Sequence, residues 1–200
     1  MSAILERKAD YLKPTPWIDF DAPEIQAHLA AYPTDGRSEE TVIRDTFEFV
    51  RDQVAHSWDV GSRRVTGRAS EVLRYGEGIC YAKSHLLAAL LRSRGIPAGL
   101  GYQRLTLGDT PESGYCLHAL NTVYVASRQQ WVRLDARGNK PGVDAQFSLD
   151  AERLAFAVRP ECGEMDYGVN LAAPPTAITR TLETHTDCRE MYARHLPTEL

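Results

Sequence analysis

The stretch "YGEGICYAKSHLLAALLRSRGIPAG", residues 75–99, sets the expectations for the fold. A glycine-rich turn precedes Cys80, and apolar residues then recur at three- and four-residue spacing until two arginines and Gly95. This pattern predicts an amphipathic helix that begins near Cys80 and ends before Gly95. Pro97 then enforces a change of direction, and the chain continues in an extended pattern. Cys80 is therefore expected in the first turn of a core helix.

Two further helices are predicted upstream of this stretch. Residues 21–32, "DAPEIQAHLAAY", place Pro23 in a first helical turn, with Asp21 or Asp19 as the capping residue. A second helix begins after Ser38, the expected cap, in "SEETVIRDTFEFVRDQVAHSW". Its core-facing positions recur at helical spacing: Val42, Ile43, Thr46, Phe47, Val50 and Val54. This pattern indicates a helix with one face in the core.

The chain after the cysteine helix changes to the period of β-strands. Residues 98–107, 115–126 and 131–136 ("AGLGYQRLTL", "YCLHALNTVYVA" and "WVRLDA") are rich in β-branched and aromatic residues. The turn-like "SRQQ" joins the last two, which predicts an antiparallel hairpin. A last amphipathic helix is expected from about Thr176 to Leu196.

The composition is that of an ordinary globular protein and names no partner. Of the 200 residues, 43% are hydrophobic and 25% are charged, enough for one well-filled core. We expect a single domain over residues 1–200, with a core at about residues 40–140 and residues 141–200 packed on it as a C-terminal extension. A net charge of −4 with scattered Lys and Arg residues argues against a nucleic-acid partner. The composition gives no oligomeric state.

Neither a secretory signal nor a membrane-spanning segment is recognisable. The first 20 residues mix charges into the apolar residues from position 6 onward, and no segment approaches the roughly 20 apolar residues that span a bilayer. We therefore expect a cytoplasmic protein without a membrane partner. The cysteines Cys80, Cys116, Cys162 and Cys188 lie far apart with no CxxC pair, which favours free thiols over a disulfide framework.

Cys80 has the local surroundings that a nucleophilic cysteine needs. A thiol attacks as the thiolate, which the partial positive charge and free N–H groups of a first helical turn favour. Gly76 and Gly78 permit a sharp turn that would bring the sulfur to a surface. Glu77 would disfavour the thiolate if its carboxylate faced the sulfur, so it is expected to face solvent or a cation. The alternative is that Cys80 is a small buried apolar residue.

A base and a group that orients it are available on the predicted hairpin. His118 and Asp135 would lie directly opposite each other if the loop had two residues, Ala126 and Ser127. A four-residue loop from Ala126 to Gln129 would make them diagonal neighbours within side-chain reach. An odd-length loop without a bulge would send the two side chains to opposite faces. Alternatively, His118 is a hydrogen-bonded polar residue of the strand and Asp135 caps the next turn.

The same region contains sulfur and nitrogen ligands that zinc accepts, namely Cys80, His85, Cys116 and His118. Cys80 and His85 are five residues apart, about 140° around a helix, so they do not share a face. Cys116 could share the side of the strand with His118, but its neighbours indicate packing. We therefore expect no metal site.

The order of these motifs resembles the bacterial transglutaminase-like proteins of the papain-like cysteine-nucleophile superfamily. The resemblance rests on "EVLRYGEGICYAKSHLLAALLRSRGIPAGLGYQRL", followed by "HALNTVYV" and "WVRLDARG", and covers about residues 40–140. It implies a papain-like α+β core in which the cysteine helix packs on an antiparallel sheet that carries the histidine and the aspartate. It also implies Cys80 as the nucleophile, His118 as general base and then acid, and Asp135 as the group that orients the imidazole.

The resemblance implies no metal or other cofactor, and it leaves the side chain that stabilises the oxyanion unassigned. Gln53, Trp58 and Tyr81 are candidates for that role or for substrate binding. The implied activity is cysteine-dependent hydrolysis of a peptide-like amide in a peptide, a protein or a small molecule, or transfer of its acyl group, through a thioester. Two alternatives are a binding module without turnover, and an amine acyltransferase that uses an acyl-thioester donor such as coenzyme A.

Overall fold

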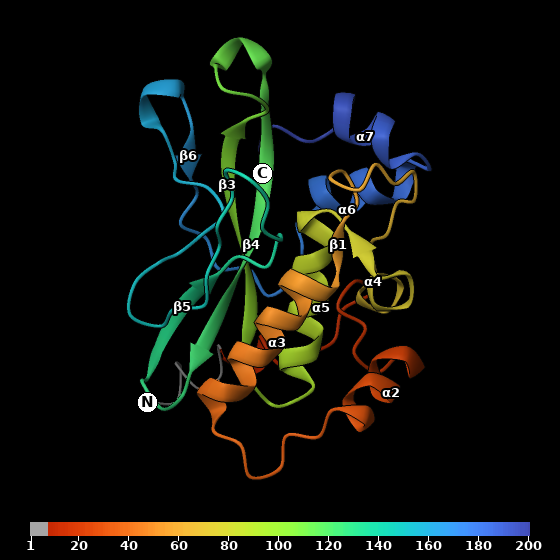
Figure 1. The fold of residues 1–200 in the computed structure, drawn as a ribbon, viewed down its shortest axis with the longest axis vertical. Coiled ribbons are helices and arrows are strands. Elements are labelled where there is room, and N and C mark those ends of the chain that lie inside the picture. The colour runs from red at the N-terminus through yellow and green to blue at the C-terminus, as the bar shows by residue number, and fades with distance from the viewer. Residues whose placement is uncertain (1–7) are drawn as a thin grey trace.

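Helices and strands lie in separate parts of an α+β fold (Figure 1). This computed structural model describes residues 8–200. Its helices are α2 (Pro23–Ala31), α3 (Glu39–Gln53), α4 (Ala69–Tyr75), α5 (Cys80–Arg92), α6 (Thr176–Thr184) and α7 (Cys188–Arg194), with short 3-10 helices at Pro111–Ser113 and Pro160–Cys162. Its strands are β1 (Ala55–His56), β2 (Glu77–Gly78), β3 (Ala98–Thr106), β4 (Tyr115–Val125), β5 (Gln130–Leu134) and β6 (Met165–Asp166).

The main sheet has the strand order β5, β4, β3, β6, and each neighbouring pair is antiparallel. β3 and β4 pair over nine residues of each strand, whereas β5 covers only the far end of β4. The pairing of β4 with β5 begins at Asn121 opposite Leu134, so His118 lies on a part of β4 that β5 does not cover. A separate parallel pair is formed by β1 and β2.

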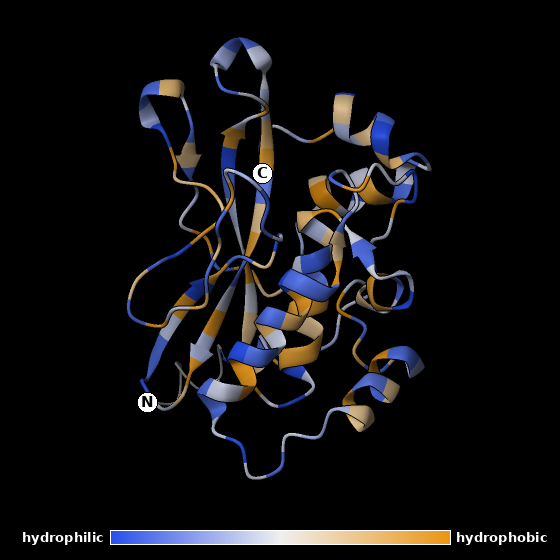
Figure 2. Ribbon diagram, in the orientation of Figure 1, coloured by the Kyte–Doolittle hydropathy of each residue, from blue (hydrophilic) through white to orange (hydrophobic). Residues whose placement is uncertain are grey.

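The central helix α5 lies between the sheet and the other helices. All its residues are buried, and it contacts β3 and β4 as well as α3 and α4. In contrast, α3 has one buried and one solvent-facing side, visible as alternating orange and blue segments in Figure 2. Because α5 is enclosed in this way, the position of its first residue is fixed relative to β4.

The elements predicted around Cys80 are confirmed. Ser38 caps α3 by accepting a hydrogen bond from the N–H of Thr41 (3.2 Å). The six positions predicted for the core face of this helix are buried: Val42, Ile43, Thr46, Phe47, Val50 and Val54. The helix that begins at Cys80 and the hairpin that follows are also present. The periodicity was sufficient here because each element presents a regular apolar face to one core.

The predicted cap of the helix at Pro23 is wrong. Ala22 is the N-cap residue and makes no side-chain capping bond. The carboxylate of Asp19 instead accepts hydrogen bonds from the N–H and the hydroxyl of Ser70 (3.0 and 2.5 Å), in the first turn of α4. Asp21 is exposed. The orphan N–H groups of a helix can be satisfied by a distant side chain, which local sequence cannot reveal.

The single helix predicted from about Thr176 to Leu196 is also wrong. The segment forms two helices, because α6 ends at Thr184 and α7 begins at Cys188. Asp187 caps α7 by accepting hydrogen bonds from two backbone N–H groups of its first turn. A good capping residue within an apolar pattern starts a new helix there.

The four cysteines are free thiols, as the absence of a CxxC pair predicted. Within residues 8–200, none of the helices combines the length and the hydrophobicity that crossing a bilayer requires.

Candidate active site

Cys80 is the first residue of α5, directly after a turn that glycine makes possible. Gly76 ends α4 in the left-handed conformation (φ +66°). Gly78 lies so close to α5 that an added Cβ would be 3.1 Å from the Cβ of Ala82. The first bond within α5 runs from the N–H of Lys83 to the carbonyl of Ile79 (3.0 Å). The N–H groups of the first turn, including that of Cys80, therefore precede the helical bonding pattern.

Glu77 faces a cation, as the nucleophile hypothesis required. Its Oε1 accepts a hydrogen bond from Nη1 of Arg64 (3.0 Å), and the Glu77 side chain is nearly buried. This pairing offsets the negative charge that would otherwise oppose a thiolate at Cys80.

His118 and Asp135 are hydrogen-bonded through the predicted hairpin geometry. Val125 pairs with Gln130, so the loop has four residues, one of the two even lengths that permitted contact. Nε2 of His118 lies 2.7 Å from Oδ2 of Asp135, and both side chains are buried. Asp135 follows the last residue of β5 and lies beyond the paired part of the ladder.

The carboxylate of Asp135 is further held by two backbone donors. The N–H of Arg137 donates to Oδ1 (3.1 Å), and the N–H of Ala155 donates to Oδ2 (3.0 Å). Burial alone would raise the pKa of Asp135, but the attraction of His118 and these hydrogen bonds hold it below its usual value. Asp135 is therefore an anion whose oxygens are fully oriented.

The His118 imidazole is held in its charged form. Burial acts to lower its pKa, but the charge of Asp135 and the hydrogen bond to Asp135, with a smaller contribution from the neighbouring Cys80, outweigh burial and raise the pKa to about 10. Since Nε2 faces Asp135, the remaining ring nitrogen is Nδ1, which is available to the thiol. The edge of the Phe156 ring packs against the imidazole (5.0 Å between ring centres, 90°). These contacts fix the ring between the carboxylate and the sulfur.

A cleft of about 430 Å³ opens in front of Cys80 and His118. Aromatic and aliphatic side chains form much of its wall: Trp58, Leu105, Leu107, Phe156, Tyr192 and Leu196. The rings of Trp58 and Tyr192 are stacked, with centres 4.5 Å apart and an interplanar angle of 13°. Arg137 and Lys140 add positive charge to the same wall. The nucleophile candidate is thus accessible from a groove that apolar and polar side chains line together.

The structure separates the three remaining candidate residues. Gln53 is exposed at the end of α3 and does not line the cleft. Tyr81 is fully buried, and its hydroxyl donates to the carbonyl of Leu117 (2.8 Å), so it has no free donor for an oxyanion. Trp58, 39% exposed, lies in the cleft wall, where it could contact a substrate.

The potential zinc ligands do not gather at one place. His85 is buried, and its Nδ1 is bonded to the carbonyl of Gly67 (2.8 Å), away from the cleft. Cys116 lines the cleft, and burial raises the pKa of its thiol to about 12. In the part of the chain from residue 8 onward, no three His, Cys, Asp or Glu side chains are grouped as metal ligands would be.

Sequence reasoning did not identify His56, Arg137 or Tyr192, all of which line the cleft. His56 lies in β1, opposite Gly78 of β2, which precedes the nucleophile turn. The pKa of His56 is far below its usual value because of burial and the nearby Arg137, so its ring is neutral. "LDARGN" offered a local signal for Arg137, since this charged residue follows the strand-end aspartate after a single alanine. For the other two residues, no local signal indicates the contact.

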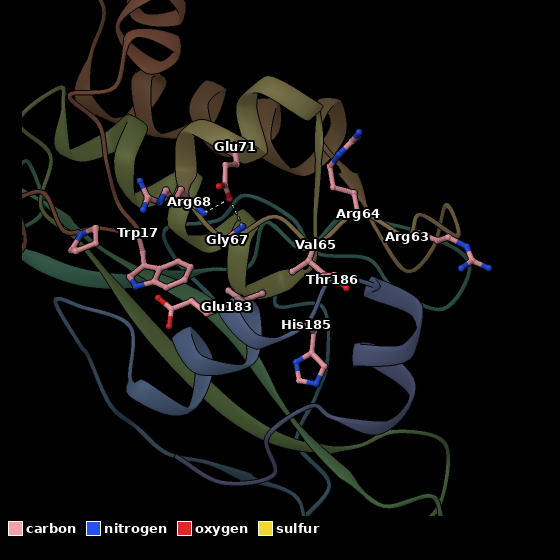
Figure 3. Close-up of a pocket in the computed structure, with 12 residues that line it drawn as sticks. Trp17, Arg63, Arg64, Val65, Gly67, Arg68, Glu71, Glu183, His185 and Thr186 are labelled. Carbon is pink, nitrogen blue, oxygen red and sulfur yellow. Dashed lines mark hydrogen bonds between the residues drawn. The ribbon is translucent and has the colours of Figure 1, made fainter.

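A second, larger hollow of about 720 Å³ lies away from this site, beside the start of α4 and the end of α6 (Figure 3). Most of its charged groups are already partnered. Arg63 pairs with Asp187, and Arg64 pairs with Glu77. Glu71 accepts from the N–H groups of residues 67 and 68, drawn as dashed lines in Figure 3. Neither the thiol nor the imidazole candidate lines it, so the smaller cleft is the candidate active site.

A comparison with protein families identifies the family of this chain. Residues 28–136, more than half of the chain, match the family model of the Transglutaminase-like superfamily. Among solved structures, the chain is similar to a candidate cysteine protease from Cytophaga hutchinsonii, with 20% sequence identity and a TM-score of 0.49. That match covers 64% of this chain and 40% of the other, so this chain spans well under two thirds of that protein's length. A comparison with curated proteins gives no match. The matched residues include Cys80, His118 and Asp135, and the chain belongs to the Transglutaminase-like superfamily.

Proposed function

We propose that the protein is a cysteine-dependent amidohydrolase or acyl transferase that acts on a peptide-like amide through Cys80, His118 and Asp135. The observation that carries the proposal is the buried hydrogen-bonded pair of His118 and Asp135 (2.7 Å), with Cys80 lining the same cleft as the imidazole. A nucleophile, a base and a group that orients the base are the parts that thiol acyl transfer requires.

The first half of the proposed reaction forms a thioester. The Cys80 thiolate attacks the carbonyl carbon of the amide, and the negative charge moves to the carbonyl oxygen. Backbone N–H groups in the first turn of α5 face this region and are suited to stabilise the oxyanion. The His118 imidazolium then gives its proton to the amide nitrogen, the C–N bond breaks, and the amine leaves.

The second half returns the enzyme to its starting state. The neutral His118 imidazole takes a proton from water, or from an incoming amine, as that group attacks the thioester carbonyl. The C–S bond breaks, the Cys80 thiolate leaves, and the acyl group departs as an acid or as a new amide. Asp135 keeps the imidazole in the tautomer that presents Nδ1 to the sulfur and stabilises its charged form.

The proposal is tested by a panel of peptide and acyl-amide substrates, with hydrolysis and transfer to an added amine measured separately. Turnover is expected in the wild type and is expected to be lost in Cys80→Ala. Cys162→Ala is the matched control, because Cys162 is half-buried but does not line the cleft. The control should keep its turnover.

Alkylation of the native protein gives a test that needs no substrate. A haloacetamide should modify Cys80 before Cys116 and Cys188, since burial raises the pKa of these two thiols to about 12 and about 11. Peptide mass mapping after a short reaction measures the order. Equal modification of the four cysteines, or turnover by Cys80→Ala, would contradict the proposal; a native fold with neither turnover nor preferential labelling would favour a binding module.

A further inference from the structure

Arg137 is a buried cation held by a carboxylate from a distant part of the chain. Its side chain is 3% exposed, and both of its terminal nitrogens donate to Asp59, the Nη2 bond being 2.9 Å long. Lys140 also donates to Asp59 (2.8 Å). Burial acts to raise the pKa of Asp59, but the hydrogen bonds from Arg137 and Lys140, together with nearby positive charge, outweigh burial and lower it to about 2. This two-pronged pairing fixes the guanidinium in one orientation.

The backbone of Arg137 is connected to the site by a direct hydrogen bond. Its N–H donates to Oδ1 of Asp135, and only one residue separates the two. Asp135 lies beyond the last pair of the β4–β5 ladder, so strand pairing does not hold it. Other contacts must therefore set the conformation of residues 135–137. One of them is the clamp on Arg137, that is, the two hydrogen bonds from its guanidinium to the Asp59 carboxylate.

The same guanidinium also contacts the ring that borders the imidazole. It lies 5.9 Å from the centre of the Phe156 ring, within the range of cation–π attraction. Phe156 in turn packs edge-on against His118, and its neighbour Ala155 donates its N–H to Asp135. Arg137 thus touches both supports of the imidazole, the carboxylate and the aromatic ring.

We propose that Arg137, clamped by Asp59, is a positioning residue that fixes the Asp135 carboxylate and the Phe156 ring and so holds the His118 imidazole toward Cys80. This inference rests on the proposed function, because it concerns the same thiol and imidazole. It goes beyond the nucleophile, base and orienting group, since Arg137 acts through other residues and does not itself transfer a proton.

The test combines three variants with one matched control. Arg137→Met removes the clamp and keeps a similar volume, Arg137→Lys keeps the charge, and Asp59→Asn removes the other half of the pair. Arg133→Met is the control, because Arg133 precedes Asp135 by two residues as Arg137 follows it, but pairs with Asp166 (2.6 Å) and Glu152 (3.0 Å) outside the cleft. Thermal unfolding confirms which variants are folded.

Two measurements report on the site without a known substrate. The first is the rate at which iodoacetamide alkylates Cys80 at pH 7. The second is the pH at which the His118 ring loses its proton, followed by NMR and assigned with a His118→Asn sample. The titratable groups around this ring are Asp135 at the end of β5, Cys80 on α5 and His56 on β1. All of them remain in the four variants.

Arg137→Met and Asp59→Asn should each slow alkylation by roughly ten- to hundredfold, the cost of misplacing a reacting group by about 1 Å. Both should also lower the pH at which His118 loses its proton, because Asp135 would be held less closely to the ring. A protein that carries both Arg137→Met and Asp59→Asn should be alkylated at Cys80 no more slowly than either single variant, because both substitutions break the same pair. Arg137→Lys should recover part of the rate, and Arg133→Met should stay within about twofold of the wild type.

A folded Arg137→Met protein with wild-type alkylation and an unchanged His118 titration would overturn the inference. So would a loss in Arg133→Met as large as that in Arg137→Met. If Arg137→Met does not fold, Asp59→Asn and Arg137→Lys decide by the same two measurements. Failure of the proposed function would look different. Cys80→Ala would still turn over the substrate, or a cysteine other than Cys80 would be labelled first.

Discussion

Asp135 accepts three hydrogen bonds while almost completely buried, and its donors come from His118, from Arg137 and from Ala155. A buried carboxylate is costly unless every oxygen is satisfied. Here the cost is offset by an imidazolium and two backbone N–H groups. At the scale of single residues, the site therefore depends on the negative charge of Asp135, which is stable in the interior because these three donors compensate it.

Asp135→Asn should reduce the rate of amide turnover by about 10⁴-fold, as loss of the orienting carboxylate does in other nucleophile–His–Asp enzymes. The neutral amide cannot stabilise the charged imidazole. Its NH2 group can also face the Nε2–H group of His118, which needs a hydrogen-bond acceptor. The measurement is kcat for the best substrate of the panel, with Asp166→Asn as a control carboxylate that binds Arg133 outside the cleft. A fall of less than tenfold would exclude the orienting role.

Asp135→Asn should also lower the stability of the protein, by an amount that depends on pH. The pKa of His118, about 10 in the folded protein, lies above its ordinary value of 6.5. The pair with Asp135 therefore gives its full stabilisation below about pH 6.5 and loses it as the pH rises through about 10. The free energy of unfolding of the wild type should exceed that of Asp135→Asn most clearly near pH 6, and the gap should narrow toward pH 10. If the difference in the free energy of unfolding between the two proteins increased with pH, the result would contradict an ion pair between His118 and Asp135.

Cys80, His118 and Asp135 could be predicted because each sits at a point that local sequence defines: a helix start, a strand and a strand end. The clamp of Asp59 on Arg137 could not, since its partners are 78 residues apart and neither lies in a regular element. The sequence makes Tyr81 a candidate for oxyanion stabilisation or substrate binding. The structure shows its hydroxyl bonded to Leu117, a contact fixed by the packing of α5 on β4.

At the scale of elements, α5 is anchored to the end of α3 by a buried lysine. Lys83 has no exposed surface, and its Nζ donates to the carbonyls of Arg51 (3.2 Å) and Val54 at the end of α3. The last carbonyls of a helix have no partner within it, so Lys83 satisfies them. Burial lowers the pKa of Lys83 to about 7, helped by the positive charge of Arg137.

Lys83→Met should change how stability depends on pH. In the wild type the folded pKa of about 7 lies below the ordinary 10.5, so the unfolded chain holds the proton more tightly. The stability that this lysine contributes is complete above about pH 10.5 and is lost as the pH falls toward 7. The wild type should therefore gain stability relative to Lys83→Met between pH 7 and pH 10.

Urea unfolding at several pH values measures this difference, and the opposite effect of His118 cancels because both proteins contain it. Lys13→Met is the control, since the Lys13 side chain is 66% exposed and, within the described part of the chain, pairs only with nearby Asp10. Its stability difference from the wild type should stay constant over the same range. A constant difference for Lys83→Met as well would contradict the buried position of the lysine.

At the scale of the whole molecule, segments far apart in sequence converge on α5 and the cleft. α7 brings Tyr192 against Trp58, and Pro197 accepts a hydrogen bond from the N–H of Leu117, next to the imidazole (2.8 Å). Periodicity predicted most of the helices and strands, but not these junctions. The break between α6 and α7 shows why, because a single capping aspartate outweighed a continuous apolar pattern.

The C-terminal end of α5 is held by an arginine that, among the residues from 8 onward, forms hydrogen bonds with carbonyls and with no acidic side chain. Arg92 is 3% exposed and donates to the carbonyls of Lys13 (2.6 Å), Ala98 (2.9 and 2.7 Å) and Ala172 (2.7 Å). These carbonyls belong to the N-terminal segment, to β3 and to the chain before α6. One side chain thus joins three separate parts of the molecule to the core helix.

Arg92→Met should destabilise the protein by about 3 kcal/mol or more, because it leaves carbonyls in three segments without their donor at about 1–3 kcal/mol for each buried unsatisfied group. Urea unfolding at pH 7 measures the loss. Arg94→Met is the matched control, since Arg94 lies two residues after α5, is only partly buried and, within residues 8–200, donates to just two carbonyls, those of Leu90 and Tyr32 (3.2 and 3.1 Å). It should cost less than about 1 kcal/mol.

The alkylation rate of Cys80 in the folded fraction of Arg92→Met should equal that of the wild type. Cys80 and Arg92 lie at opposite ends of α5, about 18 Å apart at 1.5 Å per residue. Loss of stability without loss of thiol reactivity would mean that the contacts of Arg92 support the fold independently of the site. A parallel loss of reactivity would instead mean that the two ends of α5 move together, and that the geometry at Cys80 depends on the whole set of segments that Arg92 joins.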